Sequence, residues 1–155
     1  KQLEKEGRKK DTLNKFIYHG INEDRIILEG RSPLRDYFDS YNRVDINLSP
    51  FPYGGGTTSI EGLWMGVPVL TKKGSNFVSH IGESIAHNSG LSDWIADDND
   101  DYISKAINFS SKLNELANLR KTLRNQVLLS PLFDKIKFSR YFENALWGMW
   151  KDSKN

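Results

Sequence analysis

The stretch from Gly54 to Glu61 gathers residue types that suit a phosphate and a neighbouring sugar. It holds three glycines, two threonines and a glutamate: Gly54, Gly55, Gly56, Thr57, Thr58 and Glu61. Glycines let the backbone approach a ligand closely, and the start of a helix presents free N–H groups and partial positive charge to a phosphate. The two hydroxyls add donors. A carboxylate one turn inside the helix can accept hydrogen bonds from two adjacent sugar hydroxyls, such as those of a ribose.

The same stretch has a simpler interpretation. The glycines could form only a tight corner, with Thr57 or Thr58 as an ordinary helix N-cap. The stretch is not a Walker loop, because no Gly-Lys-Ser/Thr follows the glycines. A dinucleotide fingerprint is also incomplete, because Ser59 stands where its third glycine belongs. The residue types alone leave the phosphate site and the plain corner both open.

Two other polar groups invite a metal-site interpretation. The acidic run 97–101 would need glycine and glutamate at the sixth and twelfth positions of a calcium loop, where Tyr102 and Asn108 stand. We therefore interpret the run as the acidic start of a helix. His80 and His87 are seven residues apart on one helical face, without an evident third ligand. We predict no metal site.

The glycine stretch lies within an alternation of strands and helices. Short apolar runs predict strands at 25–29, 45–48 and 67–71. Helices are expected at about 9–18, closed by Gly20, after Ser32-Pro33, from Thr57 or Thr58 to Gly66, and at about 76–86, burying Phe77. Such alternation is typical of a parallel sheet covered by helices on both faces. The glycines follow the C-terminal end of strand 45–48, where open α/β sheets bind ligands.

After Gly90 the pattern predicts helices only, with a break at Ser130-Pro131. The last helix carries a broad apolar stripe of Phe138, Tyr141, Phe142, Ala145, Leu146, Met149 and Trp150. We interpret the stripe as core; it could also seat the helix against a second domain. We likewise assign Trp64, Trp94, Trp147 and Trp150 to the core. The expected fold class is α/β, a parallel sheet with helices on both faces and a helical C-terminal segment.

Composition narrows the functional classes. The 155 residues fit one domain, 1–155, and their 22 basic and 20 acidic side chains are too balanced to predict a nucleic-acid partner. Without cysteine there is no disulfide framework. Because there is no signal-peptide pattern and no apolar run near 18 residues, we expect a cytoplasmic protein without a membrane partner. The charged N-terminal stretch, 1–10, is either a solvated tail or part of a helix that begins in a longer protein. We expect that the chain is a fragment of such a longer protein.

Segment 51–71 resembles the signature of the O-GlcNAc transferase family, including its SPINDLY-like members. Segments 24–30, 41–48 and 130–134 also resemble that family, in the same order. The resemblance implies a GT-B fold, in which two Rossmann-like halves face each other across a cleft. The chain would be the C-terminal half, a nucleotide-sugar-binding domain without the N-terminal half.

The resemblance also implies the site residues. It assigns nucleotide-sugar contacts to Arg31, Ser32, Tyr37, Gly55, Gly56, Thr57, Thr58 and Glu61. Thr57 and Thr58 match the threonines that bind the diphosphate, and Glu61 matches the acidic residue on the ribose. Tyr37 stands where many members have a histidine beside the base. Gly56 stands where animal enzymes have a donor-site histidine, so that contact is absent. No catalytic residue is assigned.

The function implied is inverting transfer of a sugar, expected to be GlcNAc, from a nucleoside diphosphate such as UDP to a protein serine or threonine. The donor would be UDP-GlcNAc or a related nucleotide sugar, with no other cofactor and no essential metal. The protein acceptor would bind through the missing N-terminal half, and the chain alone would be inactive. The alternative is a degenerate, non-catalytic Rossmann-like interaction module, which the residues at Gly56 and Tyr37 favour.

Overall fold

The computed structural model describes residues 6–154, except the side chain of Glu6. The chain divides into two compact units, Lys1–Ser40 and Tyr41–Asn155, and each is described by itself. Of the charged stretch expected at 1–10, residues 1–5 lie outside the described part of the chain, as does residue 155.

The first unit is helical. It holds α1 (Glu6–Tyr18), a 3-10 turn η1 (Glu23–Arg25) and α2 (Leu34–Ser40). Gly20 ends α1 with a φ of 81°. Its N–H donates to the carbonyl of Ile17 at 2.9 Å, and the N–H of Ile21 donates to that of Phe16 at 3.1 Å. These two bonds form a Schellman motif, so the predicted glycine stop is confirmed.

The strand predicted at 25–29 is wrong. Residues 26–33 form neither helix nor strand, and Ile27 is 76% exposed. A strand is stabilised by hydrogen bonds to a neighbouring strand, and residues 6–40 contain no strand that could supply them. The helix predicted after Ser32-Pro33 does form, and it begins at Leu34.

The second unit is built on a parallel sheet. Its strands are β1 (Asn47–Leu48), β2 (Val69–Lys72) and β3 (Ile95–Ala96), in the order β1-β2-β3. Asn47 pairs with Val69, and Thr71 pairs with Ile95. The predicted α/β class is therefore confirmed, with shorter strands than expected. β3 was not predicted, because two residues are too few to give a periodic pattern.

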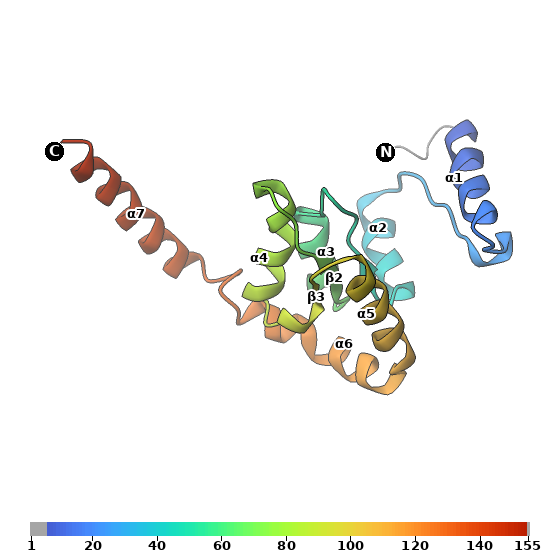
Figure 1. The fold of residues 1–155 in the computed structure, drawn as a ribbon. Coiled ribbons are helices and arrows are strands. Elements are labelled where there is room, and N and C mark those ends of the chain that lie inside the picture. The colour runs from blue at the N-terminus through green and yellow to red at the C-terminus, as the bar shows by residue number, and fades with distance from the viewer. Residues whose placement is uncertain (1–5, 155) are drawn as a thin grey trace. The chain divides into compact units, whose positions relative to one another are not determined.

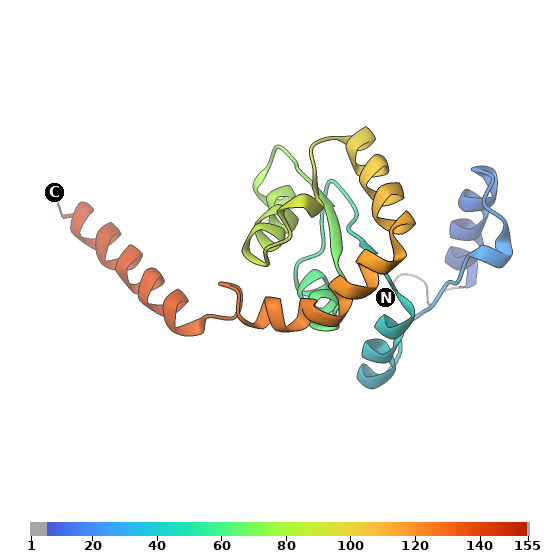
Figure 2. The same ribbon diagram turned by 90° about the horizontal axis from the view of Figure 1, so that it is seen from below.

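Helices cover both sides of β2. α3 (Thr57–Trp64) connects β1 to β2, and η3 (Phe77–His80) with α4 (Ile81–Asn88) leads towards β3 through η4 (Ser92–Trp94). α4 and α5 (Asn99–Ser111) flank β2 from opposite sides (Figures 1 and 2). α6 (Leu113–Leu128) packs against α3 and α5. The connection between β1 and the first of these helices carries the glycine turn.

The core of this unit lies around β2 and the inner faces of α4 and α6. Its buried side chains include Leu63, Val69, Leu70, Ile85, Trp94, Ile95, Leu116, Leu123 and Val127. Trp94 stacks on Phe109 with 4.1 Å between ring centroids. The prediction that Trp94 is a core residue is confirmed.

The core interpretation of the last helix is wrong for this chain. α7 (Lys135–Asp152) has no buried residue, and Trp147 and Trp150 are 56% and 54% exposed. Phe77, also predicted to be buried, is 87% exposed. An apolar stripe shows that a helix has a face suited to packing, but it does not identify the covering surface. That α7 packs against a second domain stays a prediction.

From residue 6 to residue 154, no helix combines the length and apolar character needed to cross a membrane.

Candidate functional site

The glycine turn joins the C-terminal end of β1 to the start of α3. Gly56 is the N-cap of α3, with φ −96° and ψ −91°, and no side chain caps this end. Thr57 is the first helical residue, so the predicted helix start is confirmed. The alternative in which a threonine serves as the N-cap does not hold.

The start of α3 presents backbone donors. The N–H groups of Ser59 and Ile60 both donate to the Gly56 carbonyl, at 3.0 and 3.2 Å. The first N–H groups of an α-helix have no intrahelical acceptor, so Thr57 and Thr58 supply the open donors. Both threonines are exposed. Backbone N–H groups, hydroxyls and the positive end of the helix dipole therefore meet at one surface point.

Two buried serines hold the turn from opposite sides. Ser49, 3% exposed, accepts a hydrogen bond through Oγ from the Gly55 N–H at 3.2 Å. Ser59, 2% exposed, donates through Oγ to the Gly55 carbonyl at 2.8 Å. A Cβ at Gly55 would lie only 2.7 Å from Ser59 Oγ and from Thr58 Oγ1. Gly55 is thus fixed in orientation, and a side chain there would have to displace the two hydroxyls. Sequence reasoning missed both serines as supports of the turn, although they flank the glycines.

Tyr102 on α5 supports the same turn. Its hydroxyl donates to the Ser49 carbonyl at 3.0 Å, and burial raises its pKa. The Phe51 ring lies edge-on to the Tyr102 ring, with 5.4 Å between centroids. The Nζ of Lys72 lies 4.4 Å from the centroid of the Phe51 ring. Side chains from α5 and β2 thereby fix the loop that precedes the glycines.

The remaining predicted contacts fall into two groups. Glu61 lies on α3, three positions after Thr58 and on a neighbouring part of the helix surface, and is half-buried. Tyr37 lies on α2 in the first unit, half-buried, with its ring edge-on to Phe38 at 5.3 Å between centroids. Arg31 and Ser32 precede α2 and are exposed. The second unit therefore brings together the predicted diphosphate and ribose contacts, and the predicted base contacts belong to the first unit.

The acidic run 97–101 starts α5, as predicted. Asp98 caps the helix by accepting from the Asp101 N–H at 2.9 Å. A hydrogen bond and ion pair with Asp97 at 2.6 Å raise the pKa of Lys73. The Asp97 N–H and then Lys105 lower the pKa of Asp101. The carboxylates of Asp97, Asp98 and Asp101 are thus engaged with the helix start or with lysines.

The two histidines share one carboxylate. His80 Nδ1 lies 2.6 Å from Glu83 Oε2, and His87 Nε2 lies 3.9 Å from Glu83 Oε1. Within residues 6–154, no group of three histidine, aspartate or glutamate side chains is placed to hold a metal ion.

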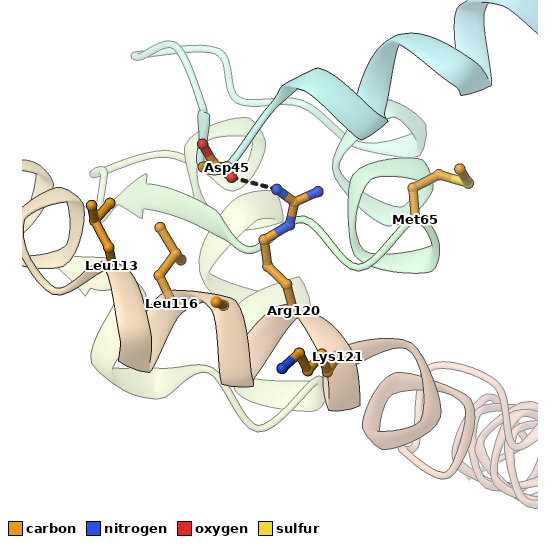
Figure 3. Close-up of a pocket in the computed structure, with 7 residues that line it drawn as sticks. Asp45, Met65, Leu113, Leu116, Arg120 and Lys121 are labelled. Carbon is orange, nitrogen blue, oxygen red and sulfur yellow. Dashed lines mark hydrogen bonds and ion pairs between the residues drawn. The ribbon is translucent and has the colours of Figure 1, made fainter.

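A hollow of about 470 Å³ lies at the other end of the sheet (Figure 3). It is lined by Asp45, Met65, Leu113, Leu116, Ala117, Arg120 and Lys121. Asp45 precedes β1, whereas the glycine turn follows it, so the two places are at opposite strand ends. Arg120 on α6 points to Asp45 and pairs with it at 2.5 Å, and it also donates to the Tyr41 carbonyl at 3.3 Å. These contacts join α6 to the start of β1, which is a structural role.

Comparisons with known proteins agree with this geometry. The family model for glycosyl transferase family 41 matches residues 6–142. A probable UDP-N-acetylglucosamine–peptide N-acetylglucosaminyltransferase SPINDLY from Solanum lycopersicum is 40% identical over 116 residues, which are 75% of this chain and 12% of that protein. The protein of the same name from Hordeum vulgare is 39% identical over 115 residues, 74% of this chain and 12% of that protein.

A solved structure is also similar. A Thermobaculum terrenum O-GlcNAc transferase mutant aligns with a TM-score of 0.85 and 31% sequence identity. The alignment covers 92% of this chain and 28% of that one. The chain therefore spans only a small part of the proteins it matches.

Proposed function

Because the chain belongs to glycosyl transferase family 41, we propose that it supplies the donor-binding part of a protein glycosyltransferase. The resemblance drawn from segment 51–71 is confirmed by the family match. The plant relatives carry the name of UDP-N-acetylglucosamine–peptide transferases. We propose the same transfer for the whole protein, from UDP-GlcNAc to a serine or threonine of a protein acceptor. We also keep the cytoplasm as its expected compartment.

One observation carries the proposal: two buried serines hold the backbone just before the start of α3, where we propose that the diphosphate binds. Ser49 accepts from the Gly55 N–H at 3.2 Å and Ser59 donates to the Gly55 carbonyl at 2.8 Å, and α3 begins at Thr57, two residues later. A diphosphate at this point would meet backbone N–H groups and hydroxyls that need not reorganise. Such preorganised donors stabilise developing negative charge most effectively.

The proposed reaction is an inverting displacement. The acceptor hydroxyl attacks the anomeric carbon from the side opposite the diphosphate, a new C–O bond forms, and the bond to the diphosphate oxygen breaks. The electron pair leaves with the diphosphate, and the hydroxyl proton passes to a general base that we propose lies in the N-terminal half of the protein. Each hydrogen bond aimed at the departing charge is worth about 2–4 kcal/mol. The start of α3 thereby takes the role that a divalent cation has in other transferases, so we propose a metal-independent reaction without a further cofactor.

The other contacts of the donor are proposed from the resemblance and from chemistry. Glu61, one turn into α3, has a carboxylate that can accept from two ribose hydroxyls. Tyr37 has a ring that can stack on the base. Arg31 and Ser32 are the proposed residues along the base.

The alternative is a non-catalytic module that keeps the fold. It draws on Gly56, which stands where animal enzymes have a histidine, and on Tyr37, which stands where many members have one. A full-length protein that binds a nucleotide sugar but transfers no sugar to any protein would favour it. Incorporation of labelled GlcNAc into protein would favour the transferase.

The test is thermal denaturation of the full-length protein with UDP-, GDP- and dTDP-sugars. We expect the UDP-sugars to raise the melting temperature most, because binding only to the native state stabilises it. Glu61→Ala should reduce the shift from UDP more than the shift from inorganic pyrophosphate, which has no ribose. If no nucleotide shifts the melting temperature at millimolar concentration, the proposal is wrong.

A further inference from the structure

Lys72 is the last residue of β2, the middle strand of the sheet. The neighbouring strand, β1, runs parallel to β2 and ends at Leu48, from which the chain continues into the glycine turn. Both strands therefore end at the same edge of the sheet. In open α/β sheets, ligands bind in the crevice outside this carboxyl edge. Lys72 thus lies at the edge of the sheet that carries the proposed diphosphate site.

An aromatic ring holds the ammonium group of Lys72 over the loop that leads to the glycines. Its Nζ lies 4.4 Å from the centroid of the Phe51 ring, which in turn lies edge-on to the Tyr102 ring. Phe51 belongs to the short loop that the 3.2 Å hydrogen bond between Ser49 and Gly55 closes. The ring face engages one side of the ammonium, and an ammonium has three N–H donors. Lys72 can therefore keep this contact and still donate to an anion.

The charge of Lys72 is not used within the fold. Among the described residues, 6–154, no carboxylate forms an ion pair with it. The next residue, Lys73, differs, because Asp97 pairs with it at 2.6 Å. Asp101 pairs with Lys105 at 3.1 Å. The two aspartates thus have other lysines as partners, and Lys72 leaves a positive charge at the carboxyl edge that can attract an anionic ligand.

We infer that Lys72 is a further catalytic residue, which donates to the departing diphosphate. The inference rests on the proposed function, because it needs a diphosphate at the start of α3. Residues 54–61 carry no cationic side chain, so Lys72 adds a charge that the turn lacks. When the bond from the anomeric carbon to the diphosphate oxygen breaks, the electron pair stays on that oxygen. A cation beside it stabilises the leaving diphosphate more than the intact donor.

The test is calorimetric titration of the full-length protein with UDP, and displacement of UDP by uridine, which has no phosphate. Lys72→Met keeps most of the side chain and removes its charge, so it should weaken UDP binding roughly tenfold and leave uridine binding unchanged. Lys72→Arg keeps the charge and should restore most of the UDP affinity. Lys121→Met is the matched control, because it removes the same charge at the opposite end of the sheet. It should bind UDP as the wild-type protein does.

Three results would overturn the inference, and they are distinguishable. If Lys72→Met binds UDP with wild-type affinity, Lys72 only packs on Phe51, and the proposed function stands. If Lys72→Met loses affinity for UDP and for uridine by the same factor, its role is to support the loop, and the proposed function again stands. If the wild-type protein does not bind UDP, the proposed function itself fails. Lys72→Gln tests the same charge if Lys72→Met does not fold.

Discussion

Ser59 donates a hydrogen bond through its hydroxyl to the carbonyl of Gly55 at 2.8 Å. Gly55 lies four residues, about one helical turn, before Ser59 in the chain. Ser49 accepts the N–H of the same glycine at 3.2 Å. The backbone of Gly55 is thus held at both its N–H and its C=O group. This arrangement makes the turn a rigid part of the fold and ties the start of α3 to the end of β1.

The first prediction concerns the space at Gly55. Gly55→Ala would place a Cβ 2.7 Å from Ser59 Oγ and Thr58 Oγ1, so we expect it to lower the free energy of unfolding by about 1–3 kcal/mol. Gly30→Ala is the control, because no atom lies within 4 Å of its Cβ position and its φ is not in the left-handed region; it should change that free energy by less than ~0.5 kcal/mol. Urea denaturation measures both. Equal losses for the two variants would contradict the crowding at Gly55.

The second prediction concerns Tyr102 and pH. Burial raises its pKa above the ordinary value of 10.0, so the folded protein retains this proton more strongly than the unfolded chain does. The contribution of Tyr102 to stability is therefore complete below pH 10 and is lost as the pH rises through the raised pKa. At pH 7, Tyr102→Phe should lower the free energy of unfolding by about 0.5–1.5 kcal/mol, because the hydrogen bond to Ser49 is lost.

This difference between the wild-type protein and Tyr102→Phe should narrow above pH 10, where the wild-type protein loses stability that the variant does not. Urea denaturation of both proteins at neutral and alkaline pH measures it. A difference that widens with pH would mean that the phenol is not held in its neutral form.

The third prediction concerns two helix glycines with opposite surroundings. Gly66 follows α3 with a φ of 75°, and a Cβ there would lie 2.9 Å from the Arg120 carbonyl oxygen. Gly66→Ala should cost at least about 1–2 kcal/mol of stability from the left-handed backbone alone. Gly148 lies inside α7 with no neighbour within 4 Å of its Cβ position. Gly148→Ala should stabilise by about 0.5–1 kcal/mol, and a loss of stability there would contradict this account of α7.

Local signals predicted the part of the fold that carries the candidate site. The apolar runs around Asn47 and Val69, with Gly66 closing the helix between them, predicted β1, α3 and β2 in order. Each of these signals acts within a few residues. The start of α3 at Thr57 was predictable for the same reason, because Thr57 comes directly after the three glycines in the chain.

Features that depend on distant residues were not predictable. Tyr102 bonds to Ser49 across 53 positions, and no local pattern links a tyrosine to a serine so far away. The strand expected at 25–29 failed because a strand depends on its neighbour and not on its own apolar run. The stripe on α7 was assigned to the core, but none of its residues is buried there, whereas Leu116, Leu123 and Val127 of α6 are.

The most direct test of the central claim is the affinity of UDP for the full-length protein and for Thr57→Val and Thr58→Val. These substitutions remove a hydroxyl and nearly keep the shape of the side chain. Hydrogen bonds to a charged group are worth about 1.5–3 kcal/mol, so each variant should bind UDP at least roughly tenfold more weakly by calorimetry. Arg120→Met, at the opposite end of the sheet, should bind UDP as the wild-type protein does. Wild-type affinity in both threonine variants would contradict a diphosphate site at the start of α3.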